Sequence, residues 1–129
     1  SLFFVKFFLV VEDDEFDAIV GLAVELGLQG LIATNTSFSR ADLLTDAAVV
    51  DAAGAGGLSG APLKERSLAV LRRVRAAVPD DFCVISAGGV ETGEDVRARM
   101  EAGATLVQGY TAFLYRGPLW ARQINRSLR

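Results

Sequence analysis

The chain has 129 residues, of which 51% are hydrophobic and 22% are charged, and its formal net charge is −3. This length and apolar content are typical of one folded domain with its own core, and they exclude an intrinsically disordered chain. A single cysteine cannot form an internal disulfide. Because the chain has no histidine, the commonest zinc ligand and the base of His-based triads are missing, so we expect no metal site of that kind.

The first segment, residues 2–11, is apolar except for Lys6 and contains many of the phenylalanines. It is shorter than the roughly 20 apolar residues of a membrane span, and its aromatic and β-branched residues favour a buried strand at 3–11. The acidic run at 12–15 suits a helix N-terminus, and apolar positions at helical spacing continue to Gly27. With no signal-peptide pattern and an unpaired Cys83, we expect a cytoplasmic protein without a membrane segment.

A second strand is predicted at residues 30–34, and a long stretch at 35–62 follows it. Within this stretch we expect a short helix near 41–44, and an apolar patch lies at 47–50. Several glycines between residues 54 and 60 indicate a mobile or tightly turning loop. Loops of this length in compact domains are usually functional or disordered.

The rest of the chain alternates between helices and strands. A capping-box-like pair, Thr92 and Asp95, marks the start of one helix. The expected elements are a helix at 63–78, a strand at 82–87, a helix at 92–102, a strand at 105–109 and a helix at 118–128. Four successive strand–helix pairs predict a single α/β domain over residues 1–129, built on a parallel sheet with crossover helices.

The arginines in the last helix, Arg122, Arg126 and Arg129, fall at helical spacing without interleaved aromatic residues. We interpret them as the solvated face of that helix. Because the chain is acidic overall, we expect no nucleic-acid partner.

Two glycine-containing turns follow strands and precede helices, at residues 87–89 and 109–111. Backbone amides at such turns can approach a phosphate closely, and (β/α)8 barrels commonly bind phosphate at the loops after their last two strands. Together the two turns favour a phosphate site, although each alone is better explained by relief of crowding. The glycines at 54–60 lack the spacing of a dinucleotide or P-loop motif.

Several ordered motifs carry a family resemblance that covers nearly the whole chain. They are the strand lysine Lys6 and the segments 30–36, 56–63, 87–90, 103–111 and 117–126. Together they resemble the C-terminal half of a dihydroorotate dehydrogenase of the membrane-associated, quinone-using class. The resemblance implies four βα units of a (β/α)8 barrel, a half-barrel that binds FMN and takes part in oxidising dihydroorotate to orotate in pyrimidine biosynthesis.

The resemblance also implies site residues. Those implied to bind FMN are Lys6, Thr34, Gly60, Gly89, Tyr110 and Thr111, and those implied to bind orotate or dihydroorotate are Asn35 and Thr36. A strand lysine at a barrel mouth can stabilise negative charge on a reduced flavin. Without the resemblance, Lys6 is better explained as a lysine that reaches out of an apolar strand, and residues 34–36 as strand-end caps.

Two features depart from the family pattern. Residues 8–10 read Phe-Leu-Val where the family has a short Ala-Pro-Asp segment, so we expect bulky apolar groups at the barrel mouth. The general-base serine of the family belongs to the other half, and neither Ser37 nor Ser59 occupies its position. We therefore assign no catalytic residue and expect this chain alone to be inactive.

A half-barrel leaves two sheet edges and an apolar face without neighbours, which predicts a homo-oligomer or a complementing half-barrel. We interpret the phenylalanine-rich start as compensation in an engineered or truncated half-barrel. One alternative is therefore an engineered half-barrel that self-associates without cofactor.

A second alternative is a receiver-like signalling module. Residues 8–15 are similar to the first strand and the Mg²⁺-binding acidic pair of response-regulator receivers, with Asp51 and Ser86 as phosphoacceptor and switch hydroxyl. The segment 106–113 lacks the lysine that receivers need. If residues 47–50 formed a strand, the fold would be a five-stranded, flavodoxin-like doubly wound sheet instead.

Overall fold

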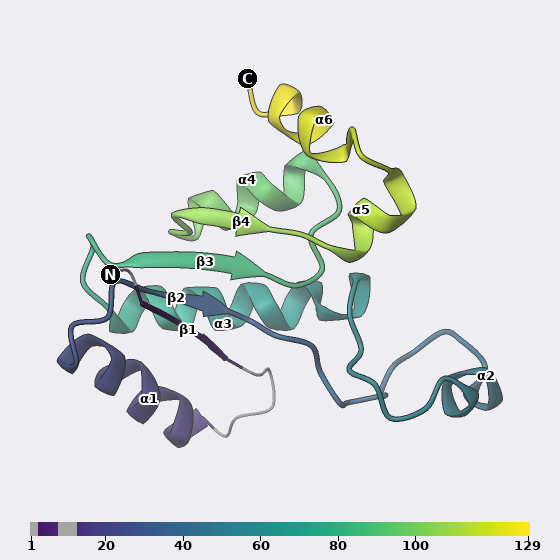
Figure 1. Ribbon diagram of the computed structural model, residues 1–129, viewed down its shortest axis with the longest axis horizontal. Coiled ribbons are helices and arrows are strands. Elements are labelled where there is room, and N and C mark those ends of the chain that lie inside the picture. The colour runs from purple at the N-terminus through teal and green to yellow at the C-terminus, as the bar shows by residue number, and fades with distance from the viewer. Residues whose placement is uncertain (1–2, 8–12) are drawn as a thin grey trace.

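The computed structural model describes residues 3–7 and 13–129 (Figure 1). Strands and helices alternate along most of the chain. In order they are β1 (Phe4–Phe7), α1 (Asp13–Glu25), β2 (Gly30–Ala33), α2 (Ala47–Ala52), a 3-10 turn η1 (Ala61–Leu63), α3 (Lys64–Ala77), β3 (Cys83–Ala87), α4 (Gly93–Glu101), β4 (Leu106–Gln108), α5 (Thr111–Arg116) and α6 (Trp120–Ser127).

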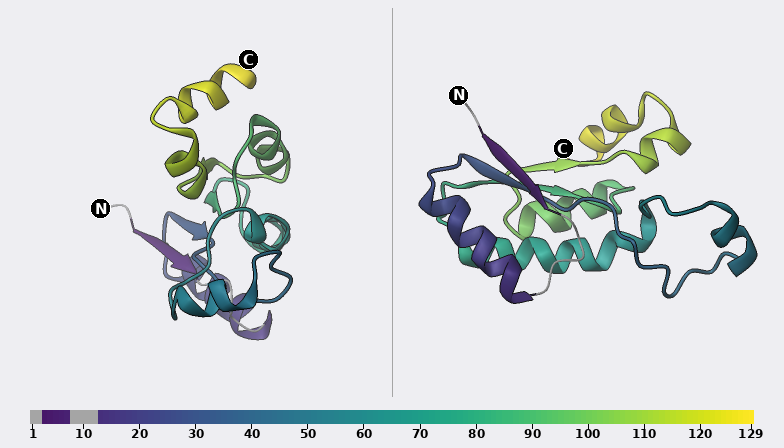
Figure 2. Two further views of the ribbon diagram at one scale, coloured as in Figure 1. Left: turned by 90° about the vertical axis from the view of Figure 1, so that its right-hand side faces the viewer. Right: turned by 60° about the horizontal axis from the view of Figure 1, so that its bottom comes forward.

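The described strands form one parallel sheet in the order β1-β2-β3-β4, which is also their order in the sequence. A doubly wound sheet reverses its strand order at a switch point and carries helices on both faces. Here the order does not reverse, and α1, α3 and α4 lie on the same side of the sheet (Figure 2). The predicted half-barrel architecture is therefore confirmed, and the flavodoxin-like alternative is wrong because residues 47–50 belong to helix α2.

The main core lies between the sheet and the helices α1 and α3. Alternate residues of the central strands, Leu31, Ala33 and Val84, are buried against these helices, as the period of two in a strand requires. The intervening positions face the other side, where Leu106 of β4 is 57% exposed. A parallel sheet is usually covered on both faces. In the described part of this chain, only the outer face of the sheet is covered by helices.

The long stretch between β2 and α3 differs from its prediction. The expected short helix near 41–44 is wrong: these residues form a turn in which Asp42 has a φ of 58°. A helix forms instead at α2, because the Asp46 side chain accepts a hydrogen bond from the Ala48 amide at 2.9 Å and so caps its N-terminus. Helix α5 also was not anticipated from the sequence.

This stretch leaves the body of the molecule and returns to it. Ser37 and Leu58 form an antiparallel bridge, with N–O distances of 3.0 and 2.7 Å, that joins its two ends. Arg40 donates to the carbonyl oxygen of Gly56 across the same segment. Figure 1 shows α2 projecting beyond this bridge, away from the sheet. The bridge therefore fixes residues 34–37 and 58–60 beside the ends of the strands.

Residues 8–10, where the family pattern is broken, lie outside the described residues, as does Glu12 of the acidic run. Within the described part of the chain, no helix is both long and apolar enough to cross a membrane.

Candidate functional site

A cavity of about 350 Å³ lies at the carboxyl-terminal edge of the sheet. The carboxyl ends of parallel strands are where α/β proteins generally bind ligands. The cavity is lined by Lys6 of β1 and by residues at the carboxyl ends of β2, β3 and β4. The lining includes all eight residues singled out from the sequence: Lys6, Thr34, Asn35, Thr36, Gly60, Gly89, Tyr110 and Thr111.

Thr34 lies at the end of β2 and is 3% exposed. Its amide donates to the carbonyl of Ala87 at 3.0 Å, which holds the ends of β2 and β3 together. Its hydroxyl is buried and has no hydrogen-bond partner among the described residues. Such a group normally finds a partner, so the Thr34 hydroxyl is suited to a ligand in the cavity. Next to it, the Asn35 side-chain oxygen accepts from the Thr36 amide at 2.9 Å, which directs the amino group of Asn35 away from that amide.

Residues from two other segments meet at the opposite wall of the cavity. The Thr111 hydroxyl donates to the Ser59 hydroxyl at 2.8 Å. Gly60 has a φ of +85°, and a Cβ there would lie 3.0 Å from the Thr111 side chain. This contact brings the Ser59–Gly60 backbone against the junction of β4 and α5.

The loop after β3 approaches the first turn of α3 very closely. Gly88 and Gly89 have φ values of +109° and +69°, which residues with a side chain rarely adopt. A Cβ on Gly89 would lie 2.5 Å from the backbone nitrogen of Lys64. Glycine is required at this position both for its conformation and for the space, so the loop backbone itself forms the cavity wall.

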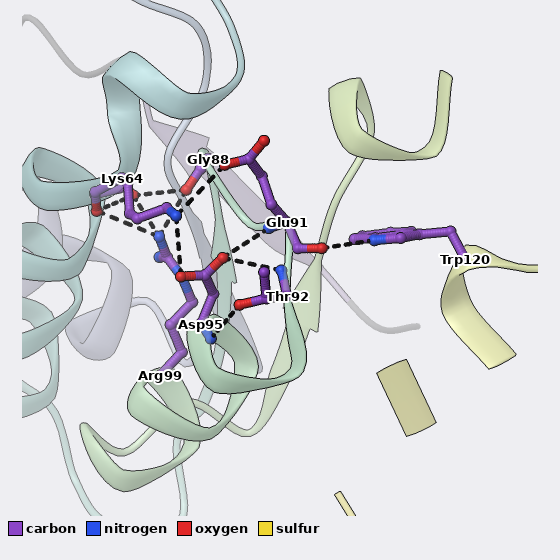
Figure 3. Close-up of polar contacts among 8 residues, drawn as sticks. Lys64, Gly88, Glu91, Thr92, Asp95, Arg99 and Trp120 are labelled. Carbon is purple, nitrogen blue, oxygen red and sulfur yellow. Dashed lines mark hydrogen bonds and ion pairs between the residues drawn. The ribbon is translucent and has the colours of Figure 1, made fainter. Parts of the chain in front are cut away.

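Arg99 of α4 is a residue that the sequence interpretation missed. It is 1% exposed and donates to Ser86 Oγ at 2.7 Å and to Ser67 Oγ at 2.8 Å. It also donates to the Gly88 carbonyl at 2.6 Å (Figure 3). Burial lowers the pKa of Arg99, whereas the negative charges of Asp95 and Glu65 act in the opposite direction. Its position three residues after the buried Val96, on the inward face of the helix, is the signal that could have revealed it.

A second polar network lies above Arg99 and ties α3 to the start of α4 (Figure 3). The Lys64 ammonium lies 3.1 Å from Asp95 and 3.4 Å from Glu91. Asp95 also accepts from the amides of Glu91 and Thr92 at 3.0 and 2.9 Å and completes the predicted capping box. The Trp120 indole donates to the Glu91 carbonyl at 2.8 Å, which extends the network to α6.

These contacts change the ionisation of both charged partners. Burial acts to raise the pKa of Asp95, but the two backbone amides and the Lys64 ammonium outweigh it, so the pKa lies below its ordinary value. Burial acts to lower the pKa of Lys64, but Asp95 and Glu91 outweigh it, and the pKa is raised.

Asp51 and Ser86, two residues of the receiver-like interpretation, are not brought together, and residues 8–12 lie outside the described part of the chain. Asp51 lies exposed in α2, and Ser86 is fully buried against Arg99, so neither presents a group at the cavity. Within residues 3–7 and 13–129, no three acidic or cysteine side chains gather as metal ligands. The assignment of Asp51 and Ser86 to phosphoacceptor and switch roles was therefore wrong.

Comparison with known proteins places the whole chain in one family. The family model described as dihydroorotate dehydrogenase matches residues 2–129. The dihydroorotate dehydrogenase (quinone) of Clavibacter michiganensis subsp. michiganensis is 70% identical over 118 residues, which are 92% of this chain and 34% of that protein. The enzyme of the same name from Leifsonia xyli subsp. xyli is 68% identical over 116 residues, 90% of this chain and 34% of that one.

A solved structure agrees with these matches. The ligand-free DHODH from Eimeria tenella is 38% identical to the chain and superimposes with a TM-score of 0.90, covering 99% of this chain and 35% of that one. The chain spans about a third of the length of the curated relatives it matches. The family resemblance predicted from the motifs is thus confirmed, and the chain belongs to the dihydroorotate dehydrogenase family.

Proposed function

We propose that this chain forms the FMN-binding part of a dihydroorotate dehydrogenase, with orotate or dihydroorotate next to the flavin. One observation carries the proposal: eight residues from five separate segments of the sequence line a single cavity at the carboxyl ends of the strands. The residues proposed to hold FMN are Lys6, Thr34, Gly60, Gly89, Tyr110 and Thr111. Those proposed to hold the pyrimidine are Asn35 and Thr36.

The cavity has features that fit a phosphorylated flavin. Its volume lies within the range of about 300–1,000 Å³ common for small-molecule sites. The Thr34 hydroxyl is buried without a partner among the described residues and would gain one from a polar edge of the flavin ring. Gly89 and Gly60 offer backbone rather than side chains, which allows close approach of a phosphate.

Each group has a physical role in this proposal. FMN, when bound, supplies the two-electron acceptor for dihydroorotate. The exposed Lys6 ammonium in β1 offsets negative charge at the cavity. The Asn35 amino group, directed away from the Thr36 amide, donates to an anionic pyrimidine, and the Thr36 hydroxyl adds a second contact. In this proposal Lys6, Asn35 and Thr36 act by binding the charged ligands and orienting them.

An FMN titration of the purified chain tests the proposal. We expect saturable quenching of FMN fluorescence, and about tenfold weaker binding after Thr34→Val, which removes one hydrogen bond to the ligand. The matched control is Thr45→Val, because Thr45 is exposed in the segment that leads to α2. Absence of saturable quenching by the wild-type chain, or equal effects of the two variants, would contradict the proposal.

We also propose that the chain alone does not oxidise dihydroorotate. Among the described residues that line the cavity, the ionisable side chains are Lys6 and Tyr110. By the family resemblance, the base that takes the substrate proton belongs to a part of the enzyme that this chain does not match. We therefore expect flavin binding without bleaching of its absorbance by dihydroorotate. Bleaching would show that a base is present after all.

A second proposal concerns association. Apolar side chains are exposed at several places: Leu106 of β4 is 57% exposed, Phe3 before β1 is 63% exposed and Tyr115 of α5 is 87% exposed. Strands β1 and β4 lie at the edges of the described sheet. Open edges and apolar faces favour pairing, so we propose a homo-oligomer or a complementing half-barrel.

Light scattering over a dilution series tests association. A monomer at all concentrations would contradict it. An oligomer that stays colourless and binds no FMN would favour the alternative of an engineered half-barrel without cofactor. The cytoplasmic location suggested by the unpaired Cys83 also stays a proposal.

A further inference from the structure

The buried guanidinium of Arg99 joins three parts of the molecule beneath the cavity. From α4 it reaches Ser86 on β3 and Ser67 on α3. It also reaches the carbonyl of Gly88 in the loop between β3 and α4 (Figure 3). Gly88 and its neighbour Gly89 line the cavity, whereas Arg99 is not among its lining residues. Arg99 therefore lies behind the wall that a ligand would touch.

A buried charge of this kind is a poor way to stabilise a core. Removing a guanidinium from water is unfavourable, and an apolar side chain of similar size often packs at least as well. The hydrogen-bond partners of Arg99 within the described chain are hydroxyl and carbonyl oxygens, which carry no formal charge. Its positive charge is thus not cancelled by a directly bonded carboxylate there, and it lies under the loop backbone.

The planar peptide between Gly88 and Gly89 connects Arg99 to the cavity. The Gly88 carbonyl oxygen is held on the buried side by Arg99 at 2.6 Å and by the Ser67 hydroxyl at 2.8 Å. In a trans peptide the C=O and N–H bonds point in opposite directions. With the carbonyl fixed toward Arg99, the Gly89 N–H points away from it. A hydrogen bond from a cation also polarises the peptide and strengthens its N–H as a donor.

We propose that Arg99 is a positioning residue for an anion in the cavity: it fixes and polarises the Gly88–Gly89 peptide so that the Gly89 N–H binds the phosphate of the ligand. The inference rests on the proposed function, because it assigns the flavin phosphate to this amide. Beyond the proposed function, Arg99, which lies behind the cavity wall, is the residue that holds the Gly89 N–H in position to donate.

The test separates phosphate recognition from stability. FMN and riboflavin share the same ring and differ by the phosphate, so the ratio of their dissociation constants measures recognition of that group. The variants are Arg99→Met and Arg99→Lys. Their matched controls are Arg97→Met and Arg97→Lys, since Arg97 lies exposed on the same helix and bonds only the Ser127 carbonyl among its described hydrogen bonds.

For Arg99→Met we expect FMN to bind about tenfold more weakly with riboflavin unchanged, the effect of one lost charge-assisted contact. Arg99→Lys restores the charge without the planar fork and is expected to lie between wild type and Arg99→Met. For the two Arg97 variants we expect the same ratio of FMN to riboflavin dissociation constants as in the wild-type chain. If Arg99→Met does not fold, Arg99→Lys and Ser86→Ala, which removes one acceptor of Arg99, carry the test. A fall in thermal stability with an unchanged FMN-to-riboflavin ratio would overturn the proposal.

A second readout does not depend on flavin. Titration of the 15N-labelled chain with inorganic phosphate should shift the Gly89 amide resonance, and less so in Arg99→Lys. If neither flavin binds but phosphate shifts Gly89 in an Arg99-dependent way, the proposed function fails and this inference stands. If FMN binds while phosphate leaves Gly89 unmoved, the inference fails and the proposed function stands. If phosphate and both flavins fail to bind, the inference is overturned together with the flavin site.

Discussion

The close approach of Gly89 to α3 predicts a large cost for a single added methyl group. In Gly89→Ala the Cβ would lie 2.5 Å from the Lys64 nitrogen and 2.6 Å from its Cα, at a φ of +69°. Forcing an L-residue into the left-handed region costs about 1–2 kcal/mol. The clash is with backbone atoms, so α3 or the loop must move, and overpacking of this kind adds about 1–3 kcal/mol. We expect a total destabilisation of about 2–5 kcal/mol.

Gly27→Ala is the control that isolates the clash. Gly27 has nearly the same φ, +68°, but no atom lies within 4 Å of a Cβ built there. Alanine stiffens the unfolded chain equally in both variants, so this effect cancels in their difference. Urea unfolding followed by circular dichroism should separate the two midpoints by about 0.7–2 M, because the clash of about 1–3 kcal/mol is divided by a typical slope of about 1.5 kcal/mol per M. Equal midpoints would show that the loop has room to move and would refute the packing argument.

Three further predictions concern groups around the cavity. Asp95→Asn should destabilise the chain by about 1–2 kcal/mol at neutral pH. The pKa of Asp95 is lowered from its ordinary value of 3.8. Its carboxylate therefore contributes its full stabilisation above that pH, and the contribution is lost as the pH falls through the lower folded pKa. The urea midpoints of the wild-type chain and Asp95→Asn should converge in acid and differ at higher pH. Trp120→Phe removes the donor to the Glu91 carbonyl and should cost about 1–3 kcal/mol in urea unfolding, whereas an unchanged midpoint would show that water replaces the indole. Thr34→Val removes a buried hydroxyl without a partner among the described residues, so it should raise the unfolding midpoint of the free chain slightly while weakening FMN; a lowered midpoint would mean that the hydroxyl already has a partner.

Much of the fold could be predicted because local signals and the hydrophobic pattern agree. The capping box at Thr92 and Asp95 and the alternating strand–helix pattern are local or periodic features, and the structure reproduces both. The turn at 41–44 was misassigned for a local reason: the Asp46 cap selects the following alanines as the helix instead. Helix α5 was missed because it is only six residues long and begins within the segment 109–111 that was assigned to a turn after the strand.

The cavity was predictable from motifs, but its supporting wall was not. Apart from Gly60, which precedes η1, the eight predicted residues lie in a strand or shortly after one, where the family resemblance and the topology point to the same place. Arg99 lies in the middle of a helix, and its partners, Ser67, Ser86 and Gly88, are separated from it by 32, 13 and 11 positions. These hydrogen bonds can be recognised only once the packing of α3, β3 and α4 is known. A charged residue on the inward face of a predicted helix would be the pattern to look for.

Several costs to stability occur together at the carboxyl-terminal edge of the sheet. The Thr34 hydroxyl is buried without a described partner, Arg99 is buried as a cation, and the Gly88–Gly89 loop can accept no side chain. A core selected for stability alone would replace the first two with apolar groups. All three surround the end of β2 and β3, whereas the core between the sheet and the helices α1 and α3 is built mainly from aliphatic side chains. This separation indicates that the carboxyl-terminal edge is adapted to a polar ligand, and that its stability and its binding should change in opposite directions when Thr34 becomes valine.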